Sequence, residues 1–297
     1  WGPFSFGGEG WILTSYQVQR TVDSRQKRYR KDVVDRSVIV AESKICAASV
    51  RVTIRDLEMR FSQDVVALRG IDLDVEEGEF VSLVGPSGCG KSTLLKIVAG
   101  LADPTSGTVE RPGIDKAPGS VGFVFQDAHL LPWRTARRNV ELLLEIQNVS
   151  GEERRRRADE ALVRVGLQGF EDAYPRQLSG GMKMRVSIAR TLVLGPQLIL
   201  LDEPFGALDE ITREKLNDDL VELTRSSGVT TLFVTHSVTE AVYLSTRVVV
   251  ISDRPGAIVD EIHVPFAKRH RDLRSTPEFF KTCATVSEAL YQGMREQ

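Results

Sequence analysis

The stretch Gly85-Pro86-Ser87-Gly88-Cys89-Gly90-Lys91-Ser92-Thr93 decides the fold of this chain. Directly before it, residues 80–84 form an apolar, β-branched run that predicts a buried parallel strand. Directly after it, the apolar spacing of residues 94–99 predicts a helix that ends at Gly100. A strand, a glycine-rich turn carrying Lys-Ser and a helix are together typical of a P-loop.

The P-loop pattern predicts a particular chemistry. Its glycines let the backbone bend so that successive N–H groups converge on phosphate oxygens at a helix N-terminus. We expect Lys91 to reach the outer phosphates and the Ser92 hydroxyl to hold Mg²⁺. The alternative is a chance match in a glycine-rich turn, which the flanking strand and helix disfavour. The stretch therefore predicts that all of residues 85–93 bind a nucleotide triphosphate.

Composition excludes several classes of protein. The chain has 297 residues, of which 41% are hydrophobic and 27% charged, as in an ordinary globular protein. A formal charge of −2 gives no overall attraction to nucleic acid or to an anionic membrane. No window approaches 18 uninterrupted apolar residues, so no segment is expected to span a bilayer. Three widely spaced cysteines indicate neither a disulfide framework nor a zinc site, and fit a reducing cytosol.

The residue pattern divides the chain into three predicted parts. Residues 1–48 read as a poorly ordered leader, with an electrostatic membrane tether as the alternative. Residues 49–268 read as the folded domain, with a mostly helical insertion at about 130–190. Residues 269–297 read as a short tail, with a helix from Pro277 onward.

The expected strands fall into two groups. Alternating patterns at residues 50–55 and 71–75 predict half-buried antiparallel strands at an edge, with Phe61 between them. More uniformly apolar runs predict further strands at residues 121–125, 198–201, 232–234, 248–251 and 258–264. Residues 103–107 read as a turn. Strands that alternate with helices predict an α/β fold with a parallel sheet, whose site lies at the strand carboxyl ends.

Four polar side chains follow these apolar strands. Asp202 and Glu203 close one strand, where the first carboxylate can orient Mg²⁺ and the second can polarise a water for attack on the γ-phosphate. Gln126 ends another strand with the reach of a water or metal ligand. His236 ends a third and can hydrogen-bond a γ-phosphate oxygen. A surface acid pair and a structural histidine are the alternatives.

A second anion-binding segment lies far from the P-loop in sequence. Ser179 is placed as the N-cap of an apolar helix, and Gly180 and Gly181 leave backbone N–H groups free. The plain alternative is a loop followed by a helix.

The ordered set GPSGCGKST, Gln126, LSGGM, LILLDEP, GALD and His236 resembles the ATP-binding subunits of ABC transporters. The resemblance covers about residues 50–265. It implies a P-loop NTPase core with a parallel sheet, an antiparallel β edge subdomain and an inserted helical subdomain. Further stretches, among them FVFQDAHLLPWRTARRNV and ISDRPGAIVDEI, resemble the importer subunits of the nitrate, sulfonate and taurine group.

The resemblance also implies roles for single residues. Glu203 becomes the general base, with His236, Lys91 and Gln126 as the other catalytic groups. ATP is held on the P-loop with Phe61 as the adenine platform, and Mg²⁺ by Ser92, Gln126 and Asp202. The residues expected to act across a homodimer are Ser179, Gly180, Gly181 and Asp209.

Partners follow from the same resemblance. The expected activity is ATP hydrolysis that powers import of a small anion or organic solute through separate permease subunits, with a solute-binding protein as an indirect partner and no nucleic acid. The permease is expected to dock on Leu130, Leu131, Pro132 and Trp133. Such a subunit lies peripherally on the cytoplasmic face of the cell membrane. The alternatives are the ATPase of an exporter or lipid-trafficking system, or a soluble ABC ATPase outside transport.

Overall fold

A computed structural model of the chain describes residues 52–62, 65–114 and 117–295. The predicted leader at residues 1–48 lies outside these ranges and stays a prediction. Within them, no helix is long and apolar enough to cross a membrane.

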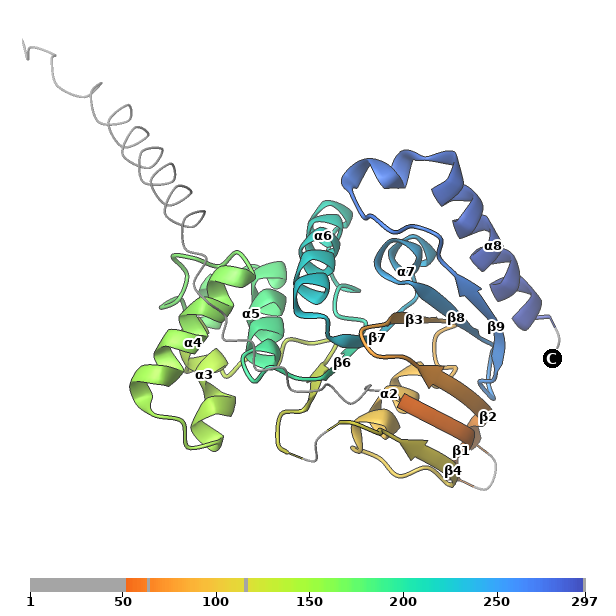
Figure 1. Ribbon diagram of the computed structural model, residues 1–297, viewed down its shortest axis with the longest axis horizontal. Helices are drawn as coiled ribbons and strands as arrows, with labels where there is room; N and C mark the ends of the chain where they lie inside the picture. The colour runs from red at the N-terminus through yellow and green to blue at the C-terminus, as the bar shows by residue number, and fades with distance from the viewer. Residues whose placement is uncertain (1–51, 63–64, 115–116, 296–297) are drawn as a thin grey trace, which may run out of the picture. The chain divides into compact units, whose positions relative to one another are not determined.

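The described residues form two sheets (Figure 1). One has three antiparallel strands in the order β2-β1-β4, and the other has six strands in the order β5-β6-β7-β3-β8-β9. The strands are β1 (Val52–Ser62), β2 (Val65–Val75), β3 (Phe80–Val84), β4 (Ser106–Glu110), β5 (Val121–Val124), β6 (Leu198–Asp202), β7 (Thr230–Thr235), β8 (Arg247–Ile251) and β9 (Ile258–His263).

Helices cover the larger sheet. The helices are α2 (Lys91–Ala99), α3 (Ala136–Ile146), α4 (Gly151–Arg164), η1 (Pro175–Gln177), α5 (Gly180–Leu192), α6 (Glu210–Ser227), α7 (Val238–Leu244), η2 (Arg271–Ser275) and α8 (Pro277–Gly293). In Figure 1, α6, α7 and α8 lie above the sheet, α2 and the antiparallel sheet lie below it, and α3, α4 and α5 form a separate helical group at the left.

The central strands are buried on both faces, which explains their continuous apolar sequences. In β3, Val81 and Leu83 belong to the core shared with α2 and the antiparallel sheet. Phe80 and Val84 belong to the other core, which the helices complete. Adjacent residues of one strand therefore serve two cores, because side chains alternate across a sheet.

The architecture confirms the predicted α/β fold with its P-loop, parallel sheet and antiparallel edge. Two details differ from the sequence-based expectation. Strand β9 pairs antiparallel with β8, because only a short turn joins them and a parallel pair needs a long crossover. Residues 106–107, expected in a turn, begin β4, whose mostly exposed residues give no apolar alternation and whose position comes from backbone pairing with β1.

Candidate functional site

The P-loop joins the end of β3 to the start of α2. Gly90 is the N-cap of α2 with φ of 107°, and a Cβ there would lie 2.6 Å from Leu68 Cδ2. Only glycine suits a position that combines left-handed backbone with such close packing. The loop thus leads directly into the N-terminus of α2, where the backbone N–H groups of the first helical turn attract anions.

Lys91 is almost fully buried over this loop, with 4% of its surface exposed. Its Nζ donates to the carbonyl oxygens of Gly85 at 2.8 Å and Pro86 at 2.7 Å. An ammonium group held by loop carbonyls at a helix N-terminus is suited to the outer phosphates of a nucleotide. The buried cation and the glycine turn therefore fit ATP.

Ser92 and Asp202 meet across the site. Ser92 Oγ donates to Asp202 Oδ1 at 2.7 Å, although the two residues are 110 positions apart. Burial raises the pKa of the Asp202 carboxyl, and the hydrogen bond from Ser92 opposes that shift. Hydroxyl and carboxylate oxygens are ligands that Mg²⁺ accepts, so the pair fits that ion. No cluster of three His, Cys, Asp or Glu side chains suited to a metal occurs in the described ranges, so phosphates and waters would complete the coordination.

Glu203 and His236 form the other pair. His236 Nδ1 lies 3.3 Å from Glu203 Oε2, and both side chains reach solvent. Glu203 has φ of 45°, a left-handed conformation that costs free energy for a residue with a side chain. Its N–H donates to Val234 O at 3.0 Å and helps to hold that conformation. A carboxylate fixed in this way, beside a histidine and next to Asp202, is placed to accept a proton.

The sheet brings these groups to one edge. Val84, which precedes the P-loop, pairs with Thr235, which precedes His236. Asp202 in turn pairs with Val234. The carboxyl ends of β3, β7 and β6 are therefore level, which is why residues far apart in sequence lie together.

Gln126 and Phe61 lie on elements outside these three strands. Strand β5 ends at Val124, one residue earlier than expected, so exposed Gln126 lies in the following loop. Phe61 lies within β1 rather than between strands, and 63% of it is exposed. An exposed ring on a strand is available for stacking.

The Ser179 segment is built differently. Ser179 caps α5 by accepting from the N–H of Met182 at 3.3 Å. Ser179 and Gly180 are exposed, whereas Gly181 is buried, and a Cβ there would lie 2.8 Å from Thr212 Cγ2. Exposed Asp209 caps α6 by accepting from the N–H of Thr212, and this hydrogen bond lowers the pKa of its carboxyl. Figure 1 shows α5 in the helical group, apart from α2.

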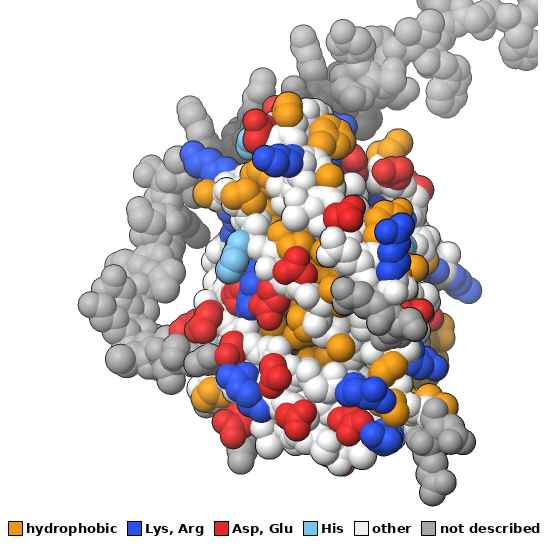
Figure 2. Space-filling view, turned by 90° about the vertical axis from the view of Figure 1, so that its right-hand side faces the viewer, with side chains coloured by type: hydrophobic (Ala, Val, Ile, Leu, Met, Phe, Trp, Pro, Cys, Tyr) orange, Lys and Arg blue, Asp and Glu red, His pale blue; other side chains and the backbone are white. Residues whose placement is uncertain are grey.

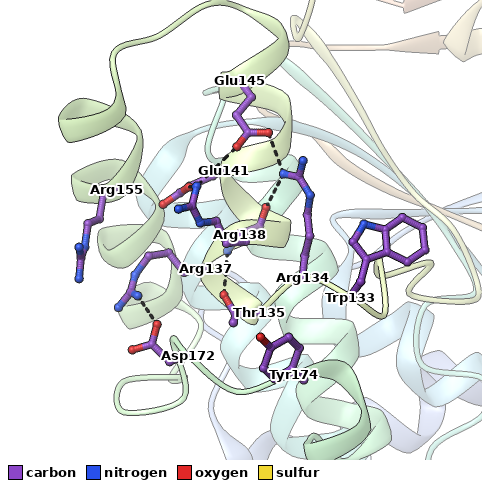
Figure 3. Close-up of a pocket in the computed structure, with 10 residues that line it drawn as sticks. All are labelled: Trp133, Arg134, Thr135, Arg137, Arg138, Glu141, Glu145, Arg155, Asp172 and Tyr174. Atoms are coloured by element: carbon purple, nitrogen blue, oxygen red, sulfur yellow. Dashed lines mark hydrogen bonds and ion pairs between the residues drawn. The ribbon is translucent and has the colours of Figure 1, made fainter.

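The predicted docking loop lies at the start of α3. Leu130 and Leu131 are half-buried, Pro132 is exposed, and 71% of Trp133 is exposed. Trp133 borders a groove of about 550 Å³. Figure 3 shows the other residues that line this groove: Arg134, Thr135, Arg137, Arg138, Glu141, Glu145, Arg155, Asp172 and Tyr174.

Asn139 organises that loop, and sequence reasoning missed its role. It is fully buried, its Oδ1 accepts from the N–H of Leu131 at 2.7 Å, and its Nδ2 donates to the carbonyls of Leu131, Arg134 and Thr135. The sequence signal that could have identified Asn139 is its position as a polar residue on the apolar face of the predicted helix. A second buried polar residue that the sequence did not lead us to expect is Glu240 in α7, which accepts from Thr235 Oγ1 at 2.5 Å; Thr235 directly precedes His236.

Comparison with known proteins identifies the family. Residues 68–206 match the pattern of the ABC transporter family. The chain is 50% identical over 219 residues to an uncharacterised ABC transporter ATP-binding protein of Methanocaldococcus jannaschii, covering 73% of this chain and 81% of that one. It is 45% identical over 240 residues to the nitrate import ATP-binding protein NrtD of Synechocystis, covering 76% and 88%. Over 234 residues it is 42% identical to the taurine import ATP-binding protein TauB of Yersinia pestis, covering 76% and 92%.

Solved structures agree with these relatives. One is a dimeric, post-hydrolysis state of an ATP-binding cassette bound to ADP and Pi, with a TM-score of 0.63 and 37% identity over 72% of this chain and 99% of that one. A complete cassette in that structure therefore corresponds to the folded domain seen here. The chain belongs to the family of ABC transporter ATP-binding proteins, as its motifs predicted.

Proposed function

We propose that this chain hydrolyses ATP to power the import of a small anion or organic solute through separate permease subunits. The observation that carries the proposal is the meeting of Lys91, the Ser92–Asp202 pair and the Glu203–His236 pair at one edge of the sheet. The import names of NrtD and TauB support the direction of transport and the solute class.

Each residue of this edge has a part in the proposed reaction. Lys91 and the P-loop N–H groups bind the β- and γ-phosphates, and Ser92 and Asp202 would hold Mg²⁺. When bound, that ion supplies positive charge that neutralises the phosphate oxygens. Glu203 orients a water toward the γ-phosphorus and accepts its proton, while His236 hydrogen-bonds a γ-phosphate oxygen. Phe61 stacks on the adenine, and Gln126 links the site to the docking loop that follows it.

We further propose that two copies act together. Ser179, Gly180 and Gly181 of one copy would cover the nucleotide on the P-loop of the other, with Asp209 beside the interface. The N-terminus of α5 supports this, because Ser179 and Gly180 face solvent at the positive end of the helix, where an anion can bind. The dimeric cassette structure supports it as well.

The permease would dock on the Leu130–Trp133 loop and the adjoining groove. An exposed tryptophan at the rim of a groove is a typical anchor site for a partner. With the permease docked there, the subunit would lie peripherally on the cytoplasmic face of the membrane. On the face shown in Figure 2, acidic and basic side chains are interspersed, which with the formal charge of −2 favours a partner other than nucleic acid.

The competing functions are an exporter or lipid-trafficking ATPase and a soluble ABC machine. Purification of the chain with its membrane partners distinguishes them. Stimulation of ATP turnover by a permease together with a solute-loaded binding protein would support import. Stimulation by a solute presented from the cytoplasmic side would contradict it.

Glu203→Gln tests the chemistry of the site. The variant should bind ATP normally, lose about 100-fold or more in turnover because the proton acceptor is gone, and accumulate an ATP-bound dimer on size exclusion. Glu240→Gln is the matched control, since that carboxyl lies behind the site and should be dispensable for turnover. Hydrolysis by Glu203→Gln near the native rate would rule out Glu203 as the base.

A further inference from the structure

The loop between β8 and β9, residues 252–257, connects the P-loop to the antiparallel sheet; we call it the brace loop. On the sheet side, Gly256 N–H donates to Ala67 O at 2.9 Å and Arg69 N–H donates to Gly256 O at 3.0 Å. Both partners lie in β2, which pairs with the strand that carries Phe61. The brace loop is therefore fixed to the sheet of the adenine platform.

On its other side, the brace loop lies directly against the P-loop backbone. A Cβ at Gly256 would be only 2.1 Å from the carbonyl oxygen of Cys89. Real Cβ atoms do not approach so closely, so this contact requires glycine. The two loops thus pack backbone against backbone.

Arg254 adds a directed contact. Its Nη2 and Nε donate to Gly88 O at 2.7 Å and 3.2 Å, so one guanidinium holds one carbonyl through two hydrogen bonds. Hydrogen bonds from a charged donor are stronger than neutral ones. The side chain itself is exposed, and so contributes little to the core.

Orienting the Gly88 carbonyl also orients the next N–H. The carbonyl of Gly88 and the N–H of Cys89 belong to one planar trans peptide, in which they point in opposite directions. Gly88 itself has φ of 80°, a conformation that glycine leaves readily. Arg254 therefore holds this peptide by its carbonyl oxygen, with the N–H directed away from the guanidinium.

We propose that Arg254 is a positioning residue of the ATP site. By fixing the Gly88–Cys89 peptide, it keeps the Cys89 N–H in the set of P-loop donors that bind phosphate, and it joins this set to the sheet that carries Phe61. The inference rests on the proposed nucleotide site and assigns no contact between Arg254 and ATP. It predicts an effect on ATP affinity with little effect on folding.

The test compares Arg254→Ala and Arg254→Lys with Arg111→Ala in the full chain. Arg111 is the matched control because its Nη1 donates to a carbonyl, Val98 O, at 3.0 Å, at the opposite end of α2. Binding of ATP is measured with a fluorescent analogue, turnover by phosphate release, and folding by thermal unfolding. Arg254→Ala should weaken ATP binding about tenfold and raise KM similarly, with kcat at saturation and Tm near native.

Arg254→Lys should recover part of the affinity, because an ammonium can donate to the same carbonyl without the two-bond geometry. Arg111→Ala should bind ATP normally. Native ATP affinity in Arg254→Ala would overturn the inference and leave the proposed function standing, as would an equal loss in Arg111→Ala. A loss of affinity that follows a loss of Tm in all three variants would also overturn it. Failure of the unsubstituted chain to bind ATP would instead overturn the proposed function, and the inference with it.

Discussion

The helices α2 and α5 both begin with a glycine-containing segment, yet the residues at their N-termini differ in burial and in contacts. At α2, Lys91 is buried, Ser92 is bonded to Asp202, and Gly90 is packed against β2. At α5, Ser179 caps its own helix, and Ser179 and Gly180 face solvent. The positive end of a helix is thus combined with a buried lysine and a Ser–Asp pair in one place, and with solvent-exposed residues in the other. This difference supports the proposal that one chain carries two halves of different ATP sites.

Mixing two inactive variants is the most direct test of whether the two helix N-termini act in one shared ATP site. Lys91→Ala disables the P-loop half of a site, and Ser179→Arg blocks the half at the N-terminus of α5. Each variant alone should therefore lose about 100-fold or more in turnover. A mixed dimer has one site with both halves intact, so an equal mixture should regain about a quarter of native turnover. Phosphate release measures the recovery, and size exclusion confirms that mixed dimers form. No recovery in the presence of mixed dimers would contradict the two-copy site.

A second prediction separates the docking loop from the fold beneath it. Asn139→Leu leaves the N–H of Leu131 without its partner. The variant should lose about 1–3 kcal/mol of unfolding free energy and should also lose permease binding. Trp133→Ala removes an exposed ring and should lose permease binding with a stability change within about 0.5 kcal/mol. Denaturant titration and co-purification measure the two effects. Normal permease binding by Trp133→Ala would show that the permease docks elsewhere.

The smallest predicted effect concerns Glu240, whose carboxyl differs from that of Glu203 in being buried. Burial raises its pKa in the folded chain above the ordinary 4.5. As pH rises above 4.5, the carboxyl of Glu240 loses its proton in the unfolded chain before it does so in the folded chain. Glu240 therefore contributes most to stability below pH 4.5, and this contribution decreases as pH rises toward the pKa of the folded chain. Glu240→Gln, which keeps an acceptor for Thr235, should therefore be more stable than native at pH 7.5 and equal at pH 4. Denaturant titrations at both pH values check this, and an equal difference at both would contradict the titration argument.

Sequence patterns predicted the elements with strong local signals. The P-loop, the apolar strands β3 and β6, and the helix from Pro277 all appear where expected, because turn glycines and apolar periodicity act over a few residues. Strand β4 was missed because its residues are mostly exposed and it depends on pairing with β1. Arg254 and Asn139 carried no chemical motif, since their roles come from backbone carbonyls that any sequence supplies.

The sequence alone predicted the set of candidate reacting groups. Lys91 and Ser92 begin the helix that follows the P-loop turn, and Asp202, Glu203 and His236 lie at or directly after the ends of apolar strands. Only the tertiary structure decided that these groups lie together at one edge of the sheet. The parallel register brings Val84 opposite Thr235 and Asp202 opposite Val234. The packing of the brace loop on the P-loop was likewise decided in three dimensions. The physical reason is that local patterns fix how each strand begins and ends, whereas pairing between strands depends on backbone hydrogen bonds and on burial of both sheet faces across the whole domain.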